Sequence, residues 1–329
     1  MSNHEVLTHI VGERDHIGHI VLNRPRALNS LNPTMVELIR AALNTWENDP
    51  GIEEVVITSA IPKAYCAGGD VRWIRDRVLA GEVEQAEQFF ADEYSLNAYM
   101  AQYPKPITAL VRGLAMGGGV GISAHLNMVV SDTTWFSMPE MDIGMVTDVG
   151  MSFLFQQKAG LPLGLYLATT AWRITASQAH ELGFVQHVIP DDRFEEATQD
   201  VLHSGAAALD TWAVTPPADT ELAPLRAGIE DAFSQGTWAG ITAALDKYPE
   251  LRAIVEEKTA HACPDSLEAT VELFHRNAQV SSVREALDNE YSYVRRVLRS
   301  PNFVEGVRAV LVDKTRDAQF VDHPITAAS

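Results

Sequence analysis

The sequence lacks most features of secreted, membrane-bound and nucleic-acid-binding proteins. It has two cysteines, Cys66 and Cys263, in 329 residues, so a disulfide framework is excluded. No apolar run approaches the ~20 residues that span a bilayer, and the N-terminus has no signal-peptide pattern. Positive charge is scarce: 25 Lys and Arg against 44 Asp and Glu give a net charge of −19, which opposes binding to nucleic acid or anionic membranes. We therefore expect a cytoplasmic protein with no nucleic-acid or membrane partner.

Familiar phosphate-binding, nucleophile and metal motifs are also missing. A dinucleotide fingerprint starting at Gly117 needs glycine at position 122, where Ile122 stands, and there is no Gly-Lys-Ser/Thr of a P-loop. A nucleophile elbow starting at Gly121 fails because its fifth residue is His125. His180-Glu181 lacks the second histidine of a zinc motif, so no metal site is expected.

The most informative region is the glycine-rich stretch at residues 111–121, Val-Arg-Gly-Leu-Ala-Met-Gly-Gly-Gly-Val-Gly. It follows an apolar run of strand character at residues 107–111 and precedes residues 120–126, whose apolar spacing predicts a buried helix. Glycine lets the backbone approach a ligand closely, and a helix start presents unpaired N–H groups with a partial positive charge. Such a place suits an anion or an oxyanion. The simpler alternative is a turn that serves only tight packing.

Signals for strands and helices alternate along the first part of the chain. Residues 9–22 predict a β-hairpin, and Asn32-Pro33 predicts the start of a helix, with Asn as N-cap and Pro at the first position. Residues 54–59 predict a strand that leads into a second glycine loop at residues 63–70. Residues 71–103 have a polar, acidic and helical pattern. A glycine loop after a strand thus occurs twice.

The character of the chain changes after Pro190. The alternation up to that point, with a further strand at residues 183–189, favours an α/β layered domain. Residues 192–208 and most of the remaining chain are a succession of amphipathic helices. We expect a core at residues 1–190 and a C-terminal helical region at residues 191–329 that completes the fold.

Three motifs in this order resemble the crotonase (enoyl-CoA hydratase/isomerase) superfamily. They are Ile-Val-Leu-Asn-Arg-Pro at residues 20–25, Lys-Ala-Tyr-Cys-Ala-Gly-Gly-Asp at 63–70 and Gly-Leu-Ala-Met-Gly-Gly-Gly at 113–119. Within that superfamily the chain is similar to the 3-hydroxyisobutyryl-CoA hydrolase family, and the pairs Glu93-Tyr94 and Glu290-Tyr291 are among the residues that carry this resemblance. The resemblance covers nearly the whole chain. It implies an α/β fold with a crotonase-like ββα spiral core, which binds acyl-CoA, and a C-terminal helical region.

The resemblance assigns the two glycine loops to an oxyanion hole. A thioester carbonyl under attack develops negative charge on oxygen, and preorganised backbone N–H donors stabilise it. Carried over from the superfamily, the donors are the N–H groups of Ala67 and Gly118. The resemblance further implies that the substrate is bound by the residues around these donors, namely Ala64, Gly68, Asp70 and Gly117. Cys66 has no histidine placed near it in the motif, so a small core residue is the better interpretation than a nucleophile.

Acidic residues decide the reaction. Hydratases of the superfamily use two glutamates; one position matches Glu140 and the other matches Gly121, which can neither hold water nor transfer a proton. The acidic residues that match the hydrolase family are Glu140, Asp148 and Glu93. We predict that Glu140 and Asp148 form the catalytic pair and that Glu93 binds or orients the substrate hydroxyl. Either carboxylate of the pair could act as general base or as nucleophile.

The leading interpretation is hydrolysis of a short branched 3-hydroxyacyl-CoA, as in valine breakdown, without a cofactor, since CoA is part of the substrate. Two alternatives stay open: an enoyl-CoA hydratase or isomerase, and a non-catalytic acyl-CoA-binding homologue. Superfamily members tend to form trimers, so a homo-oligomer is expected. Thr147 stands where the hydrolase family usually has proline, and Met151-Ser152-Phe153 follow where it has more glycine. These residues are expected to shape the acyl pocket and to alter the preferred acyl group.

Overall fold

The computed structural model describes residues 4–325, and these fall into two compact units that each combine segments far apart in the sequence. The first unit contains the residues up to 69, residues 95–136 and residues 174–219. The second contains residues 70–94, residues 137–173 and the residues from 220 onward. The division of the chain at residue 190 stays a prediction.

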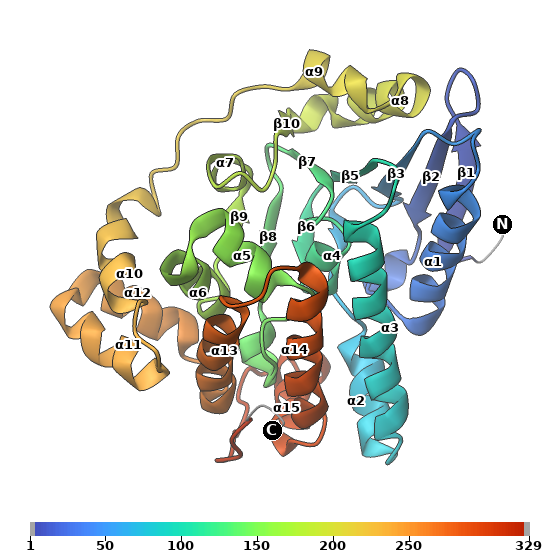
Figure 1. Cartoon of the computed structure of the whole chain (residues 1–329). Coiled ribbons are helices and arrows are strands. Elements are labelled where there is room, and N and C mark those ends of the chain that lie inside the picture. The colour runs from blue at the N-terminus through green and yellow to red at the C-terminus, as the bar shows by residue number, and fades with distance from the viewer. Residues whose placement is uncertain (1–3, 326–329) are drawn as a thin grey trace. The chain divides into compact units, whose positions relative to one another are not determined.

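The larger sheet of the first unit has six strands in the order β1-β2-β3-β5-β7-β10 (Figure 1). Strands β1 and β2 pair antiparallel as the predicted hairpin, and each later neighbour along the sheet pairs parallel. The strands are β1 (Val6–Val11), β2 (Ile17–Leu22), β3 (Glu54–Ser59), β5 (Ile107–Val111), β7 (Asn127–Ser131) and β10 (His187–Ile189).

A second, four-stranded sheet has the order β4-β6-β8-β9. Its strands are β4 (Ala64–Cys66), β6 (Leu114–Met116), β8 (Trp135–Ser137) and β9 (Ile174–Thr175). Along the chain, β3, β5 and β7 enter the larger sheet, and β4, β6 and β8, which follow them, enter the smaller one. A helical segment then follows each pair, which is the ββα spiral that the resemblance predicts. The predicted α/β class with a C-terminal helical region is confirmed.

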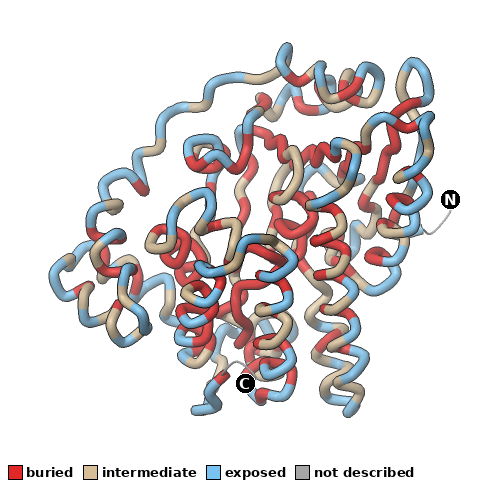
Figure 2. The backbone as a smooth tube through the Cα atoms, in the orientation of Figure 1, coloured by how far each residue is buried: buried red, intermediate tan, exposed pale blue. Residues whose placement is uncertain are grey.

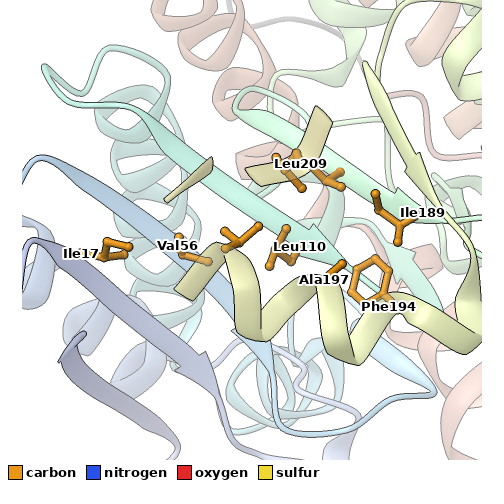
Figure 3. Packing of buried hydrophobic residues seen from close by; sticks show 9 residues of the cluster. Ile17, Val56, Leu110, Ile189, Phe194, Ala197 and Leu209 are labelled. Atoms are coloured by element: carbon orange, nitrogen blue, oxygen red, sulfur yellow. The ribbon is translucent and has the colours of Figure 1, made fainter. Parts of the chain in front are cut away.

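Helix α8 (Phe194–Ser204) covers one face of the larger sheet. Figure 3 shows Phe194 and Ala197 of this helix directed toward Leu110 and Ile189 of the strands. All these side chains are at most 5% exposed. Parallel strands buried on both faces are almost continuously apolar, and β3 and β5 appear as buried traces in Figure 2. This core fixes the strand ends from which the glycine loops emerge.

Helix α1 (Pro33–Glu47) begins where the sequence predicted a helix start, at Asn32-Pro33. The side-chain oxygen of Asn32 accepts a hydrogen bond from the Met35 N–H at 2.9 Å, and Pro33 occupies the first helical position. An N-cap of this kind satisfies one of the N–H groups that a helix start leaves unpaired.

The second unit is mainly helical, and the helices that matter for the site are α5 (Met151–Ala159), α13 (Pro264–Asn277) and α14 (Val283–Val297). Helix α5 contacts both α13 and α14 within this unit. The unit also contains α2 (Val71–Leu79), the part of α3 (Val83–Ala101) up to residue 94, α6 (Leu161–Thr169), α10 (Arg226–Ala232), α11 (Trp238–Ala244), α12 (Pro249–Thr259) and α15 (Pro301–Val307). Among the described residues, no helix is long and apolar enough to cross a bilayer.

The structure differs from the sequence-based expectation in three places. The helical region at residues 71–103 is two helices, because Gly81 between them adopts a φ of +78°, which a helix does not allow. The expected strand at residues 183–189 is shorter and is preceded by turns. The helix expected at residues 120–126 is limited to α4 (Gly118–Gly121), which continues as hydrogen-bonded turns.

Candidate active site

The two glycine loops of the first unit lie against each other. A Cβ atom added to Gly119 would overlap the Cys66 carbonyl group, so only glycine fits there. A Cβ on Gly68 would lie 3.2 Å from the Met116 oxygen and 3.7 Å from the Gly118 nitrogen. Glycine therefore allows the backbone of one loop to approach the backbone of the other, which is the tight packing that was the simpler alternative from the sequence. Close approach of these loops to a ligand stays a prediction.

Gly118 is the first residue of α4 and follows Gly117, whose backbone has φ 47° and ψ −121°. The N–H group of a first helical residue has no acceptor within the helix, so its position suits an oxyanion donor. The sequence suggested that the dipole of a longer helix would assist this donor. Because α4 contains only four residues, its contribution to the field at Gly118 is small. Any stabilisation at this position must come mainly from the N–H group itself.

The Ala67 N–H donates to the carbonyl oxygen of Leu28 at 3.0 Å. This acceptor is held by an unusual turn, in which Leu28 and Asn29 both have left-handed φ angles of 49° and 59°. The Asn29 side-chain amide donates to the Tyr65 carbonyl at 2.9 Å and so ties this turn to the same loop. As an oxyanion donor, the Ala67 N–H would have to share or exchange its bond to Leu28. The assignment of Ala67 as an oxyanion donor stays a prediction, and it requires that the hydrogen bond to Leu28 be weakened or broken.

The remaining residues assigned to substrate binding divide into two groups. Ala64 lies in β4, where its carbonyl accepts a hydrogen bond from the Ser59 hydroxyl at 2.7 Å, and it shares the first unit with Gly68 and Gly117. Asp70 falls in the second unit, where its side chain accepts a hydrogen bond from the Trp73 N–H at 3.2 Å. This contact makes Asp70 the N-cap of α2. Its role in substrate binding stays a prediction.

The second unit brings the three predicted acidic residues together. Glu93 lies in α3, Glu140 opens the 3-10 helix η2 (Glu140–Ile143), and Asp148 lies just before α5. Each is buried, with exposures of 1% for Glu93, 5% for Glu140 and 4% for Asp148. The side-chain oxygens Oε1 of Glu93 and Oε2 of Glu140 are buried and have no hydrogen-bond partner among the described residues. A buried polar atom without a partner is costly, which favours a ligand group at these two oxygens.

Burial and mutual repulsion keep these acids protonated at higher pH than usual. Burial raises the pKa of Glu93 and of Glu140 well above the ordinary value, and the charge of Asp148 raises both further. Burial also raises the pKa of Asp148, to about 7. Of the three predicted acids, Asp148 is therefore the one poised to gain and lose a proton near neutral pH.

Tyr94 stabilises the charged form of Asp148. Its hydroxyl donates to Oδ2 of Asp148 at 2.6 Å, and this hydrogen bond opposes the rise of the Asp148 pKa that burial causes. The Tyr94 ring packs edge-on against Tyr291 of α14, with ring centroids 6.3 Å apart. The preceding residue of α14, Glu290, accepts hydrogen bonds from the Gly150 N–H and the Ser152 hydroxyl. Burial raises the pKa of Glu290 to about 8.

Sequence reasoning gave no role to Tyr94 or Glu290. The available signal was their place in the pairs Glu93-Tyr94 and Glu290-Tyr291, which carried the resemblance without saying what each residue contacts. Thr147, a departure from the family pattern, is fully buried, and its hydroxyl has no partner among the described residues. Among residues 4–325, no group of His, Cys, Asp and Glu side chains has the arrangement of a metal site.

Comparisons with known proteins agree on one family. A family model described as enoyl-CoA hydratase/isomerase matches residues 17–328. A frog protein (Xenopus tropicalis) named mitochondrial 3-hydroxyisobutyryl-CoA hydrolase is 35% identical over 316 residues, which cover 92% of this chain and 81% of the relative.

Two solved structures match at similar identity but have different names. A crystal structure of a carnitinyl-CoA dehydratase from Mycobacterium thermoresistibile is 36% identical, with a TM-score of 0.88, and the match covers 98% of this chain and 99% of that one. A crystal structure of an enoyl-CoA hydratase from Rhodobacter sphaeroides is 35% identical, with a TM-score of 0.85, covering 97% of this chain and 93% of that one. The relatives thus agree on the fold and differ in the reaction that their names state.

Proposed function

Because this chain belongs to the enoyl-CoA hydratase/isomerase family, we propose that it is an acyl-CoA thioester hydrolase that acts on a short branched 3-hydroxyacyl-CoA such as 3-hydroxyisobutyryl-CoA. The observation that carries this proposal is the buried cluster of Glu93, Glu140 and Asp148, in which the pKa of Asp148 lies at about 7. Hydrolysis at neutral pH needs a group that accepts a proton there and a neighbouring acid that keeps one.

The proposed roles follow from the protonation states. Ionised Asp148 activates the water that attacks the thioester carbonyl, or attacks the carbonyl itself. Glu140, which stays protonated because of burial and the nearby Asp148 charge, donates a proton to the departing thiolate of CoA. The products are the free hydroxy acid and CoA thiol. The backbone N–H groups of Gly118 and Ala67 stabilise the oxyanion, each typically contributing ~3 kcal/mol to the barrier reduction.

Glu93 supports the proposed substrate class. Its unpartnered, buried Oε1 suits a hydrogen bond with a hydroxyl group on the acyl chain. A site built to bind a hydroxyl rejects the analogue that lacks it, because its own polar atoms are then left unpaired. Isobutyryl-CoA, which lacks only the hydroxyl, should therefore have a kcat/KM lower by about 100-fold or more than 3-hydroxyisobutyryl-CoA.

The test of the proposal is thiol release from a panel of acyl-CoA thioesters, with isobutyryl-CoA and crotonyl-CoA beside 3-hydroxyisobutyryl-CoA. The proposal predicts that 3-hydroxyisobutyryl-CoA is hydrolysed fastest. It also predicts that Glu93→Leu, which removes both side-chain oxygens, lowers the ratio of its kcat/KM to that of isobutyryl-CoA. An equal rate on both thioesters would contradict the substrate class. Absence of thiol release from all of them would contradict the hydrolase assignment.

A single turnover in water labelled with ¹⁸O separates the two routes for Asp148 and Glu140. If a carboxylate only activates water, the label enters the released acid in the first turnover. If a carboxylate attacks the thioester, an enzyme-bound anhydride forms, and attack of water at the enzyme's carboxyl carbon places the label in the protein. Mass spectrometry of the peptides that contain the two residues reads out this difference.

Hydration or dehydration of an acyl-CoA is the second candidate, because the two similar solved structures are named a dehydratase and a hydratase. The glutamate pair of the superfamily's hydratases is incomplete here, since Gly121 takes one of its positions and is itself buried in α4. Replacement of the missing glutamate by Asp148 or Glu93 would require water to be held from other elements of the chain. Hydrolysis is therefore the preferred function.

Four further parts of the proposal concern the setting of the reaction. We propose a role in valine breakdown and a cytoplasmic location, although the frog relative is named mitochondrial. We also propose that no cofactor takes part beyond the CoA of the substrate, so dialysis against EDTA should leave the rate unchanged. A homo-oligomer, with a trimer as the family-based expectation, is checked by light scattering.

A further inference from the structure

Glu290 is a fully buried carboxyl group on α14 that the proposed reaction does not use. Both of its oxygens accept hydrogen bonds from the segment that follows Asp148. Its Oε2 accepts from the Gly150 N–H at 2.7 Å, and its Oε1 accepts from the Ser152 hydroxyl. The Glu290 side chain therefore accepts hydrogen bonds from two residues, Gly150 and Ser152, of the same short segment.

The segment between Asp148 and α5 has a backbone that is unfavourable without such support. Val149 has φ 52° and Gly150 has φ 79°, so two successive residues are left-handed. A β-branched residue such as valine rarely adopts this conformation and keeps it only where the surrounding structure imposes it. The bond between Glu290 and the Gly150 N–H acts directly after the strained residue. Asp148 is the residue directly before it.

Further contacts make the support rigid. The Ser152 hydroxyl also accepts a hydrogen bond from the Asn277 side chain of α13 at 2.6 Å, and Asn277 accepts one from Asn289 of α14 at 2.7 Å. The other anchor of Asp148 is Tyr94, whose ring packs against Tyr291. Helix α14 thus supports Asp148 from two sides, through Glu290 on the backbone after it and through the Tyr291–Tyr94 contact at its carboxylate. The sequence predicted that Ser152 shapes the acyl pocket, whereas its hydroxyl belongs to this network.

We propose that Glu290 is a positioning residue that holds the strained Val149-Gly150 turn and thereby aims the Asp148 carboxylate for the reaction. The expected effect of Glu290 on turnover rests on the proposed hydrolase function. Its expected effect on the order of residues 148–152 does not depend on any substrate. Ser152 is the partner through which Asn277 reinforces the same turn.

The kinetic test compares Glu290→Ala with Glu290→Gln and with Asp288→Asn, an exposed acidic residue of the same helix that serves as the matched control. Glutamine keeps an acceptor oxygen for the Gly150 N–H, while its NH2 group can donate to the Ser152 hydroxyl, which reverses the direction of that hydrogen bond. We expect Glu290→Ala to lower kcat by about 100-fold with KM changed by less than about threefold, since a misplacement of ~1 Å costs this much. Glu290→Gln should recover most of the rate, and Asp288→Asn should behave as wild type.

A double-mutant cycle with Asp148→Asn separates positioning from a general loss of structure. If Glu290 acts through Asp148, its removal should lower the residual rate of Asp148→Asn by less than about threefold, because residues that act as a unit are not additive. An equal loss in both backgrounds would overturn the proposal. Wild-type kcat in a folded Glu290→Ala protein would overturn it as well.

Amide hydrogen exchange supplies a readout that does not depend on activity. Peptides covering residues 148–152 should exchange faster in Glu290→Ala, and unchanged protection would contradict the proposed support. If Glu290→Ala fails to fold, Ser152→Ala replaces it, with an expected loss of kcat of about tenfold and the same change in exchange. An unaltered rate and protection in Ser152→Ala would overturn the proposal. Wild-type protein that releases no thiol from any substrate, but whose exchange depends on Glu290, would contradict the proposed function and retain the supporting role.

Discussion

The glycine loops of the first unit and the acidic cluster of the second are two different ways of building chemistry into a protein. In the proposed mechanism the loops act through backbone N–H groups, and at Gly68 and Gly119 the absence of a side chain allows the two backbones to approach. The cluster is proposed to act through its carboxyl groups, whose pKa values are raised by burial. Backbone donors have a fixed charge distribution at every pH, whereas the cluster gains and loses protons. The two regions should therefore respond differently to substitution and to pH.

The largest expected effect follows from substitutions in the cluster that keep shape and remove acid–base chemistry. We predict that Glu140→Gln and Asp148→Asn each lower kcat by ~10³-fold, within the range that general acid–base catalysis contributes. Substrate affinity should stay within about tenfold, because the loss falls on the transition state rather than on binding. Steady-state kinetics with a direct measurement of acyl-CoA binding checks this. Turnover close to wild type in either variant would remove that residue from the mechanism.

A somewhat smaller effect is expected from the loops. Gly118→Pro removes the proposed donor, and Pro is compatible with the first position of a helix, so the variant has a route to fold. We predict a loss of kcat of ~10²-fold or more, which is typical for one oxyanion donor. Gly118→Ala is the matched control because it keeps the N–H group.

The two Gly118 variants must be compared as folded proteins that still bind CoA. If Gly118→Ala is as inactive as Gly118→Pro, the loss of activity comes from the added carbon atoms and not from the removed N–H donor. A fully active proline variant would end the oxyanion assignment of Gly118.

The pH response sharpens the comparison further. Because the proposed mechanism uses the ionised form of Asp148 and its pKa is about 7, kcat/KM should rise with pH through neutrality. The hydrogen bond from Tyr94 lowers that pKa, so Tyr94→Phe should move the rise about one pH unit higher and cost up to ~10-fold at pH 7. The matched control is Tyr291→Phe, which keeps the ring that packs on Tyr94. Identical pH profiles for wild type and Tyr94→Phe would show that the ionisation of Asp148 does not cause the rise of kcat/KM with pH.

The smallest effect concerns stability. Burial raises the pKa of Glu290 in the folded protein to about 8 from an ordinary value of 4.5, so the folded form keeps a proton that the unfolded chain has lost. The resulting stabilisation is complete below about pH 4.5 and is lost as the pH rises through about 8. Glutamine has no such dependence. Between about pH 5 and about pH 9, Tm should therefore fall less in Glu290→Gln than in wild type or Asp288→Asn. Parallel Tm curves would contradict the raised pKa.

The sequence predicted the loops more completely than the cluster because their determinants are local. A strand followed by glycines can be recognised within about ten residues, and the hairpin, α1 and most strands of the larger sheet were predicted in the same way. The short strands β4, β6 and β9 were not, because two or three residues carry too little periodicity. The bond from Ala67 to Leu28 was also unpredictable, since it depends on a turn at Leu28 whose left-handed backbone has no glycine signal.

The cluster could be predicted only as far as a resemblance reached. It supplied Glu93, Glu140 and Asp148, but no local pattern showed that Tyr94 donates to Asp148 or that Glu290 holds the turn after it. Glu290 is 140 residues away from Gly150 in the sequence, and the packing of α5 against α14 brings them together. The pKa values of these acids depend on burial, which is a property of the folded protein.

The most direct test of the central claim, that this carboxyl cluster performs hydrolysis, is a side-by-side measurement on 3-hydroxyisobutyryl-CoA and crotonyl-CoA with one protein preparation. Thiol release and loss of enoyl absorbance are followed together, and products are identified by mass spectrometry. With a glycine at position 121 in place of the second hydratase glutamate, we predict rapid thiol release from 3-hydroxyisobutyryl-CoA and negligible hydration of crotonyl-CoA. Rapid hydration of crotonyl-CoA without thiol release from either substrate would contradict the hydrolase assignment and establish a hydratase.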